Sequence, residues 1–97
     1  MKIQITEEAE FDLVDGYWFY ERQTPGLGDY FRSSLVSDID SLTFYAGIHE
    51  QACGSHRSLS KRFPFAIYYE VSSETVTVVA VLDCRRRPSW IRRRLQM

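Results

Sequence analysis

The sequence predicts an α+β domain in which an N-terminal helical hairpin packs on a small, twisted, antiparallel sheet and a short helix ends the chain. Two amphipathic segments on either side of Thr24–Gly26 predict the hairpin, because apolar residues recur at helical spacing in each. Two strand-like segments, 63–71 and 76–82, are joined by a short polar break of hairpin length. With 97 residues, 44% of them hydrophobic, the chain is expected to form one domain, residues 1–97.

The first half supplies a strand and both helices of the hairpin. Residues 2–5 alternate as a half-buried strand does. Thr6 is expected to cap a helix over about residues 7–23, because acidic side chains fill its first turn, and a second helix begins at Gly28 or Asp29. The side chains expected to form the buried stripes are Ala9, Leu13, Tyr17 and Tyr20, with Phe11, Val14 and Trp18 adjoining, and Phe31, Leu35, Ile39 and Leu42 in the second helix.

The second half supplies the sheet. Phe65, Ile67, Tyr69 and Val71 are expected to face one side of it, and Ala66, Tyr68 and Glu70 the other. Residues 76–82 are apolar at nearly every position, which predicts a central strand covered on both faces. Residues 44–62 show no clean period, although 56–60 fit an edge strand, and a final helix is expected from 90 to about 95.

The composition argues against several classes of protein. No run of residues is long and apolar enough to span a bilayer, and the N-terminus does not resemble a signal peptide, so a cytoplasmic location is expected. Cys53 and Cys84 are too few for a disulfide framework, and the spacing of Cys53 with His49 and His56 matches no standard zinc pattern. Gly26–Gly28 lacks the further glycine of a phosphate loop. No metal or cofactor is therefore implied.

The formal net charge of −1 hides a strong asymmetry. Residues 1–50 carry three basic and ten acidic side chains, whereas residues 51–97 carry nine basic and three acidic ones, so the halves have net charges of −7 and +6. This distribution predicts two faces with different partners, or halves that neutralise each other within one molecule. The nine basic residues of the second half are Arg57, Lys61, Arg62, Arg85–Arg87 and Arg92–Arg94.

Guanidinium groups match phosphates and carboxylates bidentately, so this cluster suits an RNA backbone or an acidic protein surface equally. Consecutive arginines on a helix point in different directions, so all six of the C-terminal arginines cannot face one ligand. Some of them are expected to pair with the acidic first helix instead. Trp90 is expected either to anchor a base or a partner side chain, or to staple the last helix to the domain, whereas Trp18 is expected in the core.

Taken in order, these residues resemble the RelE/ParE superfamily of type II toxin–antitoxin toxins, and most of all its ParE branch, also called plasmid-stabilisation proteins. The resemblance covers nearly the whole chain. It rests on Ala9 and Leu13, the aromatic run 17–20, the break Pro25–Gly28, the stripe Phe31, Leu35, Ile39 and Leu42, the strand Arg62–Tyr69, and Val78–Leu82 running into Cys84–Pro88. It implies an antiparallel sheet that carries a helical hairpin, and an antitoxin that wraps and neutralises the toxin.

The resemblance implies one of two activities. ParE-like members inhibit DNA gyrase and are not nucleases, whereas RelE-like members cleave mRNA on the ribosome with basic groups and a C-terminal tyrosine. This chain has Ala66 where cleaving members often carry an arginine, and no tyrosine follows Tyr69. Gyrase inhibition is therefore the leading hypothesis, with target binding assigned to Arg62, Arg85, Arg86, Arg87, Trp90, Arg92 and Arg93.

The alternatives are a ribosome-dependent mRNA endoribonuclease and a non-toxic member that only binds an antitoxin. Metal-free RNA cleavage needs one group to take the 2′-hydroxyl proton and another to support the leaving oxygen. His56, Arg57 and Arg85 are the candidates for these roles. Arginine stabilises charge well but is a poor base because it stays protonated, so His56 would have to accept the proton.

Overall fold

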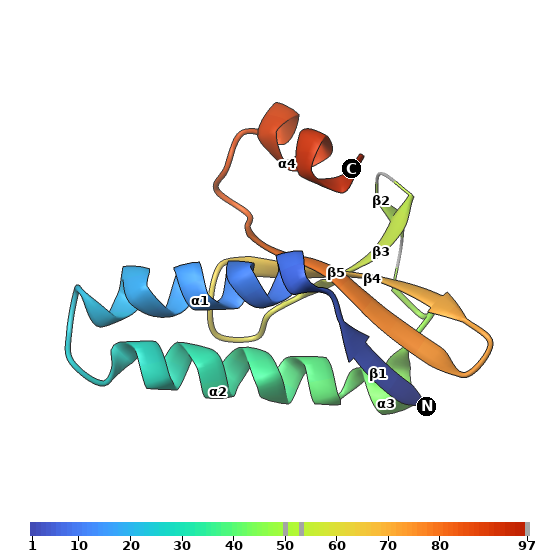
Figure 1. The fold of residues 1–97 in the computed structure, drawn as a ribbon, viewed down its shortest axis with the longest axis horizontal. Coiled ribbons are helices and arrows are strands. Elements are labelled where there is room, and N and C mark those ends of the chain that lie inside the picture. Colours follow the sequence, from blue (N-terminus) through green and yellow to red (C-terminus); the bar gives the residue numbers. More distant parts are fainter. Residues whose placement is uncertain (50, 53, 97) are drawn as a thin grey trace.

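A computed structural model describes residues 1–49, 51–52 and 54–96 and confirms the predicted α+β architecture. Its five-stranded sheet has the order β1-β5-β4-β3-β2. Figure 1 shows α1 and α2 side by side as an antiparallel hairpin and α4 apart from them. The elements are β1 (Lys2–Ile5), α1 (Glu7–Glu21), α2 (Leu27–Asp40), α3 (Leu42–Tyr45), β2 (Gln51–Ala52), β3 (Ser55–Leu59), β4 (Phe65–Ser72), β5 (Thr75–Asp83) and α4 (Pro88–Leu95).

Local hydrogen bonds fix the ends of the hairpin helices. Thr6 caps α1 as predicted, because its hydroxyl accepts a hydrogen bond from the Ala9 amide at 3.2 Å. The helix ends at Glu21, two residues earlier than expected, and the carboxylate of Glu21 accepts hydrogen bonds from the Gly26 and Gly28 amides. Gly26 has φ of 92°, a conformation that favours glycine, so the sequence of this turn positions α2 against α1.

The buried face of α1 is narrower than the sequence predicts. Ala9, Gly16 and Tyr20 are buried, and Gly16 allows close packing because a Cβ there would lie 2.5 Å from Cζ of Phe31. The expectation that the second stripe of α1 is buried was wrong: its side chains are 60%, 51% and 51% exposed at Phe11, Val14 and Trp18. At 100° per residue these three lie opposite the buried face, so a helix that packs on one side only leaves them in solvent.

The β4–β5 hairpin forms the centre of the sheet. Phe65, Ile67 and Tyr69 face the helical hairpin and Ala66 and Tyr68 face the other side, as predicted. The register between the strands shifts at Tyr68/Tyr69, where Tyr68 pairs with Ala80 and Tyr69 with Val78. The extra residue in β5 therefore reverses the alternation of its side chains beyond the bulge.

The edges of the sheet differ from the prediction in two details. β1 pairs parallel with β5, whereas β2 to β5 are antiparallel as expected. β1 covers only Thr75–Val78 of β5, so the rest of that strand has no strand neighbour on this side among the described residues. β3 confirms the strand expected over 56–60, but β2 pairs with its first two residues, so that part of β3 is not an edge.

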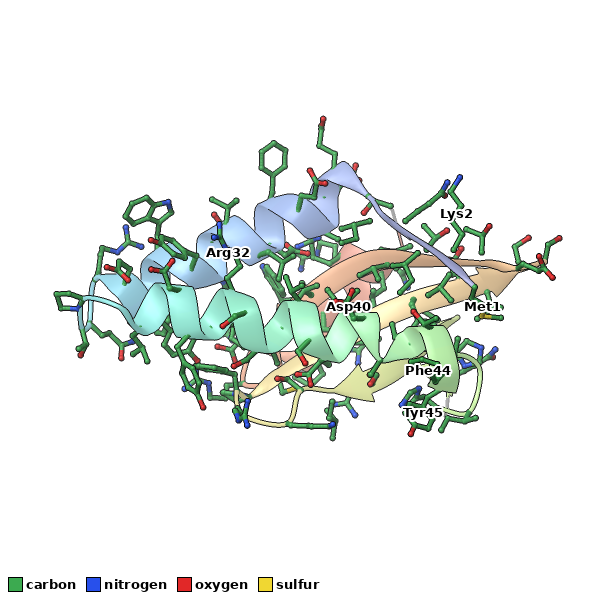
Figure 2. The ribbon with its side chains drawn as sticks, turned by 90° about the horizontal axis from the view of Figure 1, so that it is seen from below. Met1, Lys2, Arg32, Asp40, Phe44 and Tyr45 are labelled. Carbon is green, nitrogen blue, oxygen red and sulfur yellow. The ribbon has the colours of Figure 1, made fainter. Side chains whose placement is uncertain are left out.

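Two apolar clusters lie on the two faces of the sheet. The larger one joins α1, α2 and α3 to the sheet and includes the predicted stripe of the second helix, with Phe31, Leu35 and Ile39 in α2 and Leu42 in α3. The outer face of α2 is polar, with Arg32 and Asp40 in solvent (Figure 2). Beyond the end of α2, Phe44 and Tyr45 project beside the N-terminus.

No described helix is long and apolar enough to cross a membrane.

Candidate functional site

The C-terminal helix α4 lies on the sheet face opposite the hairpin. Trp90, Ile91 and Leu95 pack against a buried cluster formed by Ala66, Tyr68, Ala80 and Leu82. Trp90 is half-buried there, so the staple is the geometry that the structure supports for this side chain. The arginines that follow β5 are consequently held between the end of the sheet and α4.

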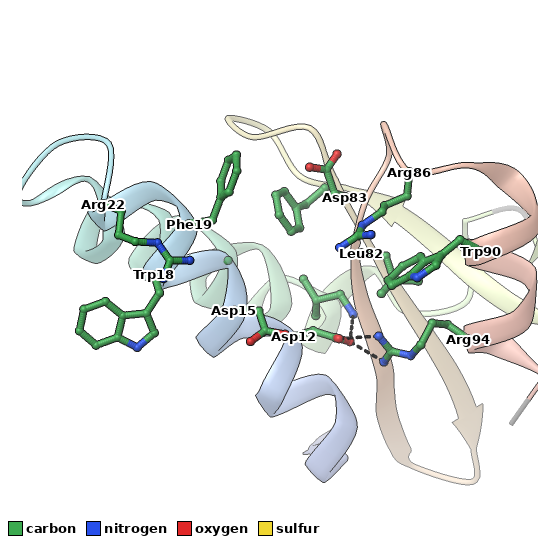
Figure 3. Close-up of a pocket in the computed structure, with 13 residues that line it drawn as sticks. Asp12, Asp15, Trp18, Phe19, Arg22, Leu82, Asp83, Arg86, Trp90 and Arg94 are labelled. Carbon is green, nitrogen blue, oxygen red and sulfur yellow. Dashed lines mark hydrogen bonds and ion pairs between the residues drawn. The ribbon is translucent and has the colours of Figure 1, made fainter.

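Asp12 of α1 clamps α4 to the domain. Its carboxylate receives two hydrogen bonds from the Arg94 guanidinium, at 2.6 and 2.8 Å, and a third from the Val81 amide at 3.0 Å (Figure 3). The hydrogen bonds to Asp12 raise the pKa of Arg94. One arginine of the cluster, Arg94, thus pairs with the acidic first helix, as one of the sequence hypotheses expected. Through these hydrogen bonds Asp12 links α1 to both β5 and α4.

A groove of about 590 Å³ opens between α1 and α4. Figure 3 shows Trp18, Phe19 and Arg22 on the α1 side, and Arg86, Trp90 and Arg94 on the side of α4. The end of β5, from Val81 to Asp83, which β1 does not pair with, forms part of its floor. The groove therefore combines large aromatic surfaces with charges of both signs.

Two of the predicted target-binding arginines make contacts within the domain. The Arg85 guanidinium donates to both carboxylate oxygens of Asp83, at 2.9 and 2.7 Å, which lowers the pKa of Asp83 and raises that of Arg85. The guanidinium of Arg86 lies 4.2 Å from the ring centroid of Trp90, a cation–π distance. Both groups stay exposed to solvent, so they are oriented by their neighbours and still reachable.

The other predicted arginines are free for contacts outside the domain. The side chains of Arg87, Arg92 and Arg93 are exposed and make no hydrogen bond or ion pair with any described residue. Arg62 is also exposed and lies over the ring of Tyr30 at 6.0 Å. Arg62 sits in the loop before β4, which a hydrogen bond from the Cys84 amide to the Pro64 carbonyl holds beside the end of β5. Of the seven predicted side chains, the six arginines are thus exposed at the end of the sheet and on α4, whereas Trp90 packs between α4 and the sheet.

The three candidates for RNA cleavage do not converge. His56 faces the hairpin side, where its ring stacks on Tyr69, whereas Arg57 faces the α4 side and donates from Nε to the Tyr68 hydroxyl at 3.3 Å. Successive residues of a strand point to opposite faces, so the sheet separates these two side chains. Arg85 comes two residues after Asp83, which pairs with Phe65 of β4, whereas His56 pairs with Tyr69 of the same strand. Phe65 and Tyr69 are about 13 Å apart along β4, at about 3.3 Å per residue.

His56 and Arg57 instead hold the structure together locally. Nδ1 of His56 donates to the His49 carbonyl at 2.8 Å, and Nδ1 of His49 lies 2.6 Å from the Tyr69 hydroxyl. The hydrogen bond to Tyr68 raises the pKa of Arg57. Cys53 lies outside the described residues, and the described part of the chain contains no group of three His, Cys, Asp or Glu side chains that could hold a metal.

Sequence reasoning missed the α1 side of the groove. It assigned Trp18 to the core and gave no role to Phe19 or Arg22. The only available signal was the excess of aromatic residues in α1, which fill more than one face of the helix and so cannot all be buried.

Comparison with known proteins shows a strong structural likeness. No protein-family model and no curated protein matches the sequence. The fold is similar to that of a chain in the structure of a chromosomal ParDE TA (toxin–antitoxin) system from P. aeruginosa, with a TM-score of 0.75 and 19% sequence identity. The match covers 84% of this chain and 92% of the other one.

Proposed function

We propose that this chain is the toxin of a type II toxin–antitoxin module, of the ParE branch of the RelE/ParE superfamily, and that it inhibits DNA gyrase by direct binding. The observation that carries the proposal is the set of exposed, unpaired arginines on and before α4, on a fold similar to a chain of a ParDE system. Guanidinium groups that have no partner in the domain can bind carboxylates of another protein at little cost in lost internal contacts.

The arrangement of the cleavage candidates also supports inhibition by binding. A general base and the groups that stabilise charge must reach the same substrate atoms. His56 and Arg57 lie on opposite faces of the sheet, and His56 is held by the His49 carbonyl. A protein that acts by contact needs only an accessible surface, which Arg87, Arg92 and Arg93 provide.

The second candidate is a ribosome-dependent mRNA endoribonuclease, and the fixed contact between Arg57 and the Tyr68 hydroxyl favours it. An arginine beside a phenol is a reasonable pair for stabilising a phosphate and moving a proton. Tyr68 is only 3% exposed beneath α4, however, so RNA would have to displace that helix to reach it. A non-toxic family member that only binds an antitoxin is the third candidate.

We further propose a cytoplasmic protein that is neutralised by a cognate antitoxin. A partly disordered, acidic segment of the antitoxin would fold on binding and place carboxylates against the free arginines. The affinity of this complex should fall with salt, because exposed charge pairs are screened. A dissociation constant that does not change with salt would show that apolar contacts alone hold the complex.

The decisive experiment is tightly controlled induction in a bacterial host that carries a DNA-damage reporter. Growth arrest with the reporter switched on is expected, because a trapped gyrase leaves damaged DNA. Arrest with a silent reporter and new in-frame mRNA ends would overturn gyrase inhibition in favour of mRNA cleavage. Normal growth at good expression would identify the non-toxic alternative.

Variants then test the site. Arg87→Ala/Arg92→Ala/Arg93→Ala should abolish growth arrest with little change in thermal stability, because these exposed side chains make no hydrogen bond or ion pair with a described residue. Arg32→Ala on the outer face of α2 is the matched control and should leave toxicity unchanged. Unchanged toxicity of the triple variant would refute the assignment of the target-binding surface.

A further inference from the structure

We propose that this chain forms a two-fold symmetric dimer in which the outer face of α1 of each molecule packs on α4 of the other. The first observation is the exposed stripe of Phe11, Val14 and Trp18, called here the α1 stripe. It occupies positions i, i+3 and i+7 of one helix face and extends for about 10 Å at 1.5 Å per residue. Large apolar side chains that gather in this way on a soluble domain mark an interaction surface.

The charges beside the α1 stripe restrict its partner. Four exposed acidic side chains, Glu7, Glu8, Glu10 and Asp15, lie along it, against one exposed basic side chain, Arg22, beside Trp18. An acidic segment, such as the one that would bind the arginines, would be repelled here. The stripe therefore fits a partner with basic residues and some apolar surface.

Helix α4 of a second copy has this composition. It presents Arg92 and Arg93 to solvent, and Ile91 and Leu95 beside them are only partly buried. Its eight residues extend for about 12 Å at 1.5 Å per residue, close to the length of the α1 stripe.

Contacts within one molecule leave most of these charges unpaired. In residues 1–49, 51–52 and 54–96 the ion pairs are Arg94–Asp12 and Arg85–Asp83, and only the first joins the acidic and basic halves of the chain. The halves carry −7 and +6, so one internal pair neutralises little of this separation. Charges that cannot meet within a molecule can meet between two copies of it.

The position of the two surfaces suits two-fold symmetry. α1 and α4 are neighbours, joined by Asp12 and Arg94, and they form the two walls of one groove (Figure 3). A rotation of 180° about an axis through that groove places α1 of each molecule on α4 of the other. Such an interface is closed and uses the same contacts twice, so each favourable contact counts double.

Analytical ultracentrifugation of the whole chain tests the proposal. From about 1 to about 500 µM in low salt, the wild type should pass from monomer to dimer. Raising the salt from about 50 to about 500 mM should weaken the dimer at least about tenfold, because the charge pairs beside the apolar stripe are exposed and are screened by salt. A wild type that stays monomeric over this range would overturn the proposal, and binding of a basic amphipathic peptide by that monomer would assign the stripe to a foreign partner instead.

Charge reversal gives the sharper test. Glu7→Arg/Asp15→Arg and Arg92→Glu/Arg93→Glu should each be monomeric, because like charges then face each other in both copies of the interface. An equimolar mixture of the two variants should form a heterodimer. In one of its two contacts the altered, basic α1 meets the altered, acidic α4, and in the other contact the unaltered α1 meets the unaltered α4. Asp40→Arg on the far side of α2 is the control and should dimerise as the wild type does.

Circular dichroism of each variant confirms that it is folded before it is compared. Failure of the two folded variants to associate when mixed, or dimerisation of either variant alone, would refute the α1–α4 contact. The readout is the oligomeric state and not toxicity, so the dimer is tested separately from the proposed function. Both proposals use Arg92 and Arg93, so the dimer would have to dissociate before these side chains could bind the target.

Discussion

Replacing Asp12 by alanine should lower the free energy of unfolding by about 3 kcal/mol. The Asp12 side chain is 9% exposed and that of Arg94 is 21% exposed, so the pair is neither fully buried nor on the surface. Loss of this partly buried, bidentate pair should contribute about 1–2 kcal/mol. The Val81 amide loses its acceptor in the same variant, and a buried donor left without a partner costs about 1–2 kcal/mol more.

A double-mutant cycle separates the two contributions. Arg94→Ala should cost about 1.5 kcal/mol, less than Asp12→Ala, because it leaves the bond from the Val81 amide in place. The coupling energy between the two substitutions should be about 1 kcal/mol. Urea unfolding followed by circular dichroism measures all four proteins, and the Asp12→Ala midpoint should fall by about 2 M if the m value is about 1.5 kcal/mol/M.

Fluorescence of Trp90 gives a second, local readout of the clamp. It is best measured in a Trp18→Phe background, in which Trp90 is the single tryptophan. Asp12→Ala should shift the emission of Trp90 to the red in the folded state, because α4 loses its polar attachment to α1. Costs that simply add, with a coupling energy below about 0.3 kcal/mol, would refute the conclusion that Asp12 holds α4 through Arg94.

Three further predictions concern packing, a buried hydroxyl and acid stability. Gly16→Ala should cost about 2 kcal/mol in thermal or urea unfolding, because its Cβ would lie 2.5 Å from the fully buried ring of Phe31; stability equal to the wild type would show that the ring moves aside. Tyr69→Phe should cost about 1–3 kcal/mol, because the buried hydroxyl accepts a bond from the amide of residue 47, and faster amide exchange there would locate the loss. Hydrogen bonds from Arg85 lower the pKa of Asp83 in the folded protein. The contribution of this pair to folding stability is therefore present above pH 3.8, the ordinary pKa, and is lost as the pH falls through the lower pKa of the folded protein. Asp83→Asn should therefore flatten the fall in stability below about pH 4, by a few tenths of a kcal/mol because the Arg85 side chain is 58% exposed; an identical pH profile would contradict this.

Ser37→Ala is a suitable control for the packing predictions. Its side chain is exposed on α2 and makes no hydrogen bond with a described residue, so its effect should stay within about 0.5 kcal/mol. If Ser37→Ala lowered the free energy of unfolding as much as Gly16→Ala does, the hairpin would be sensitive to any substitution. The effect of Gly16→Ala could then not be assigned to the contact with Phe31.

The sequence by itself determined the elements of the fold. Periodicity predicted the helical hairpin and the β4–β5 hairpin, and the capping role of Thr6 was visible because local hydrogen bonds depend on residues close in the chain. The buried stripe of α2 was also predicted, since α2 has a single apolar face. These features depend on contacts within a few residues or on strict alternation, both of which a sequence displays directly.

Only the tertiary structure decided which of several similar residues are buried, paired or free. α1 has two apolar stripes, and the position of Gly16 against Phe31 determines that Trp18 faces solvent. The six C-terminal arginines look alike in the sequence, yet Asp12, 82 residues away, takes Arg94 and leaves Arg92 and Arg93 exposed. The separation of His56 from Arg57 follows once β3 pairs in the sheet, because alternation then sends adjacent side chains to opposite faces. The candidate site therefore depends on long-range contacts, whose partners the sequence does not specify.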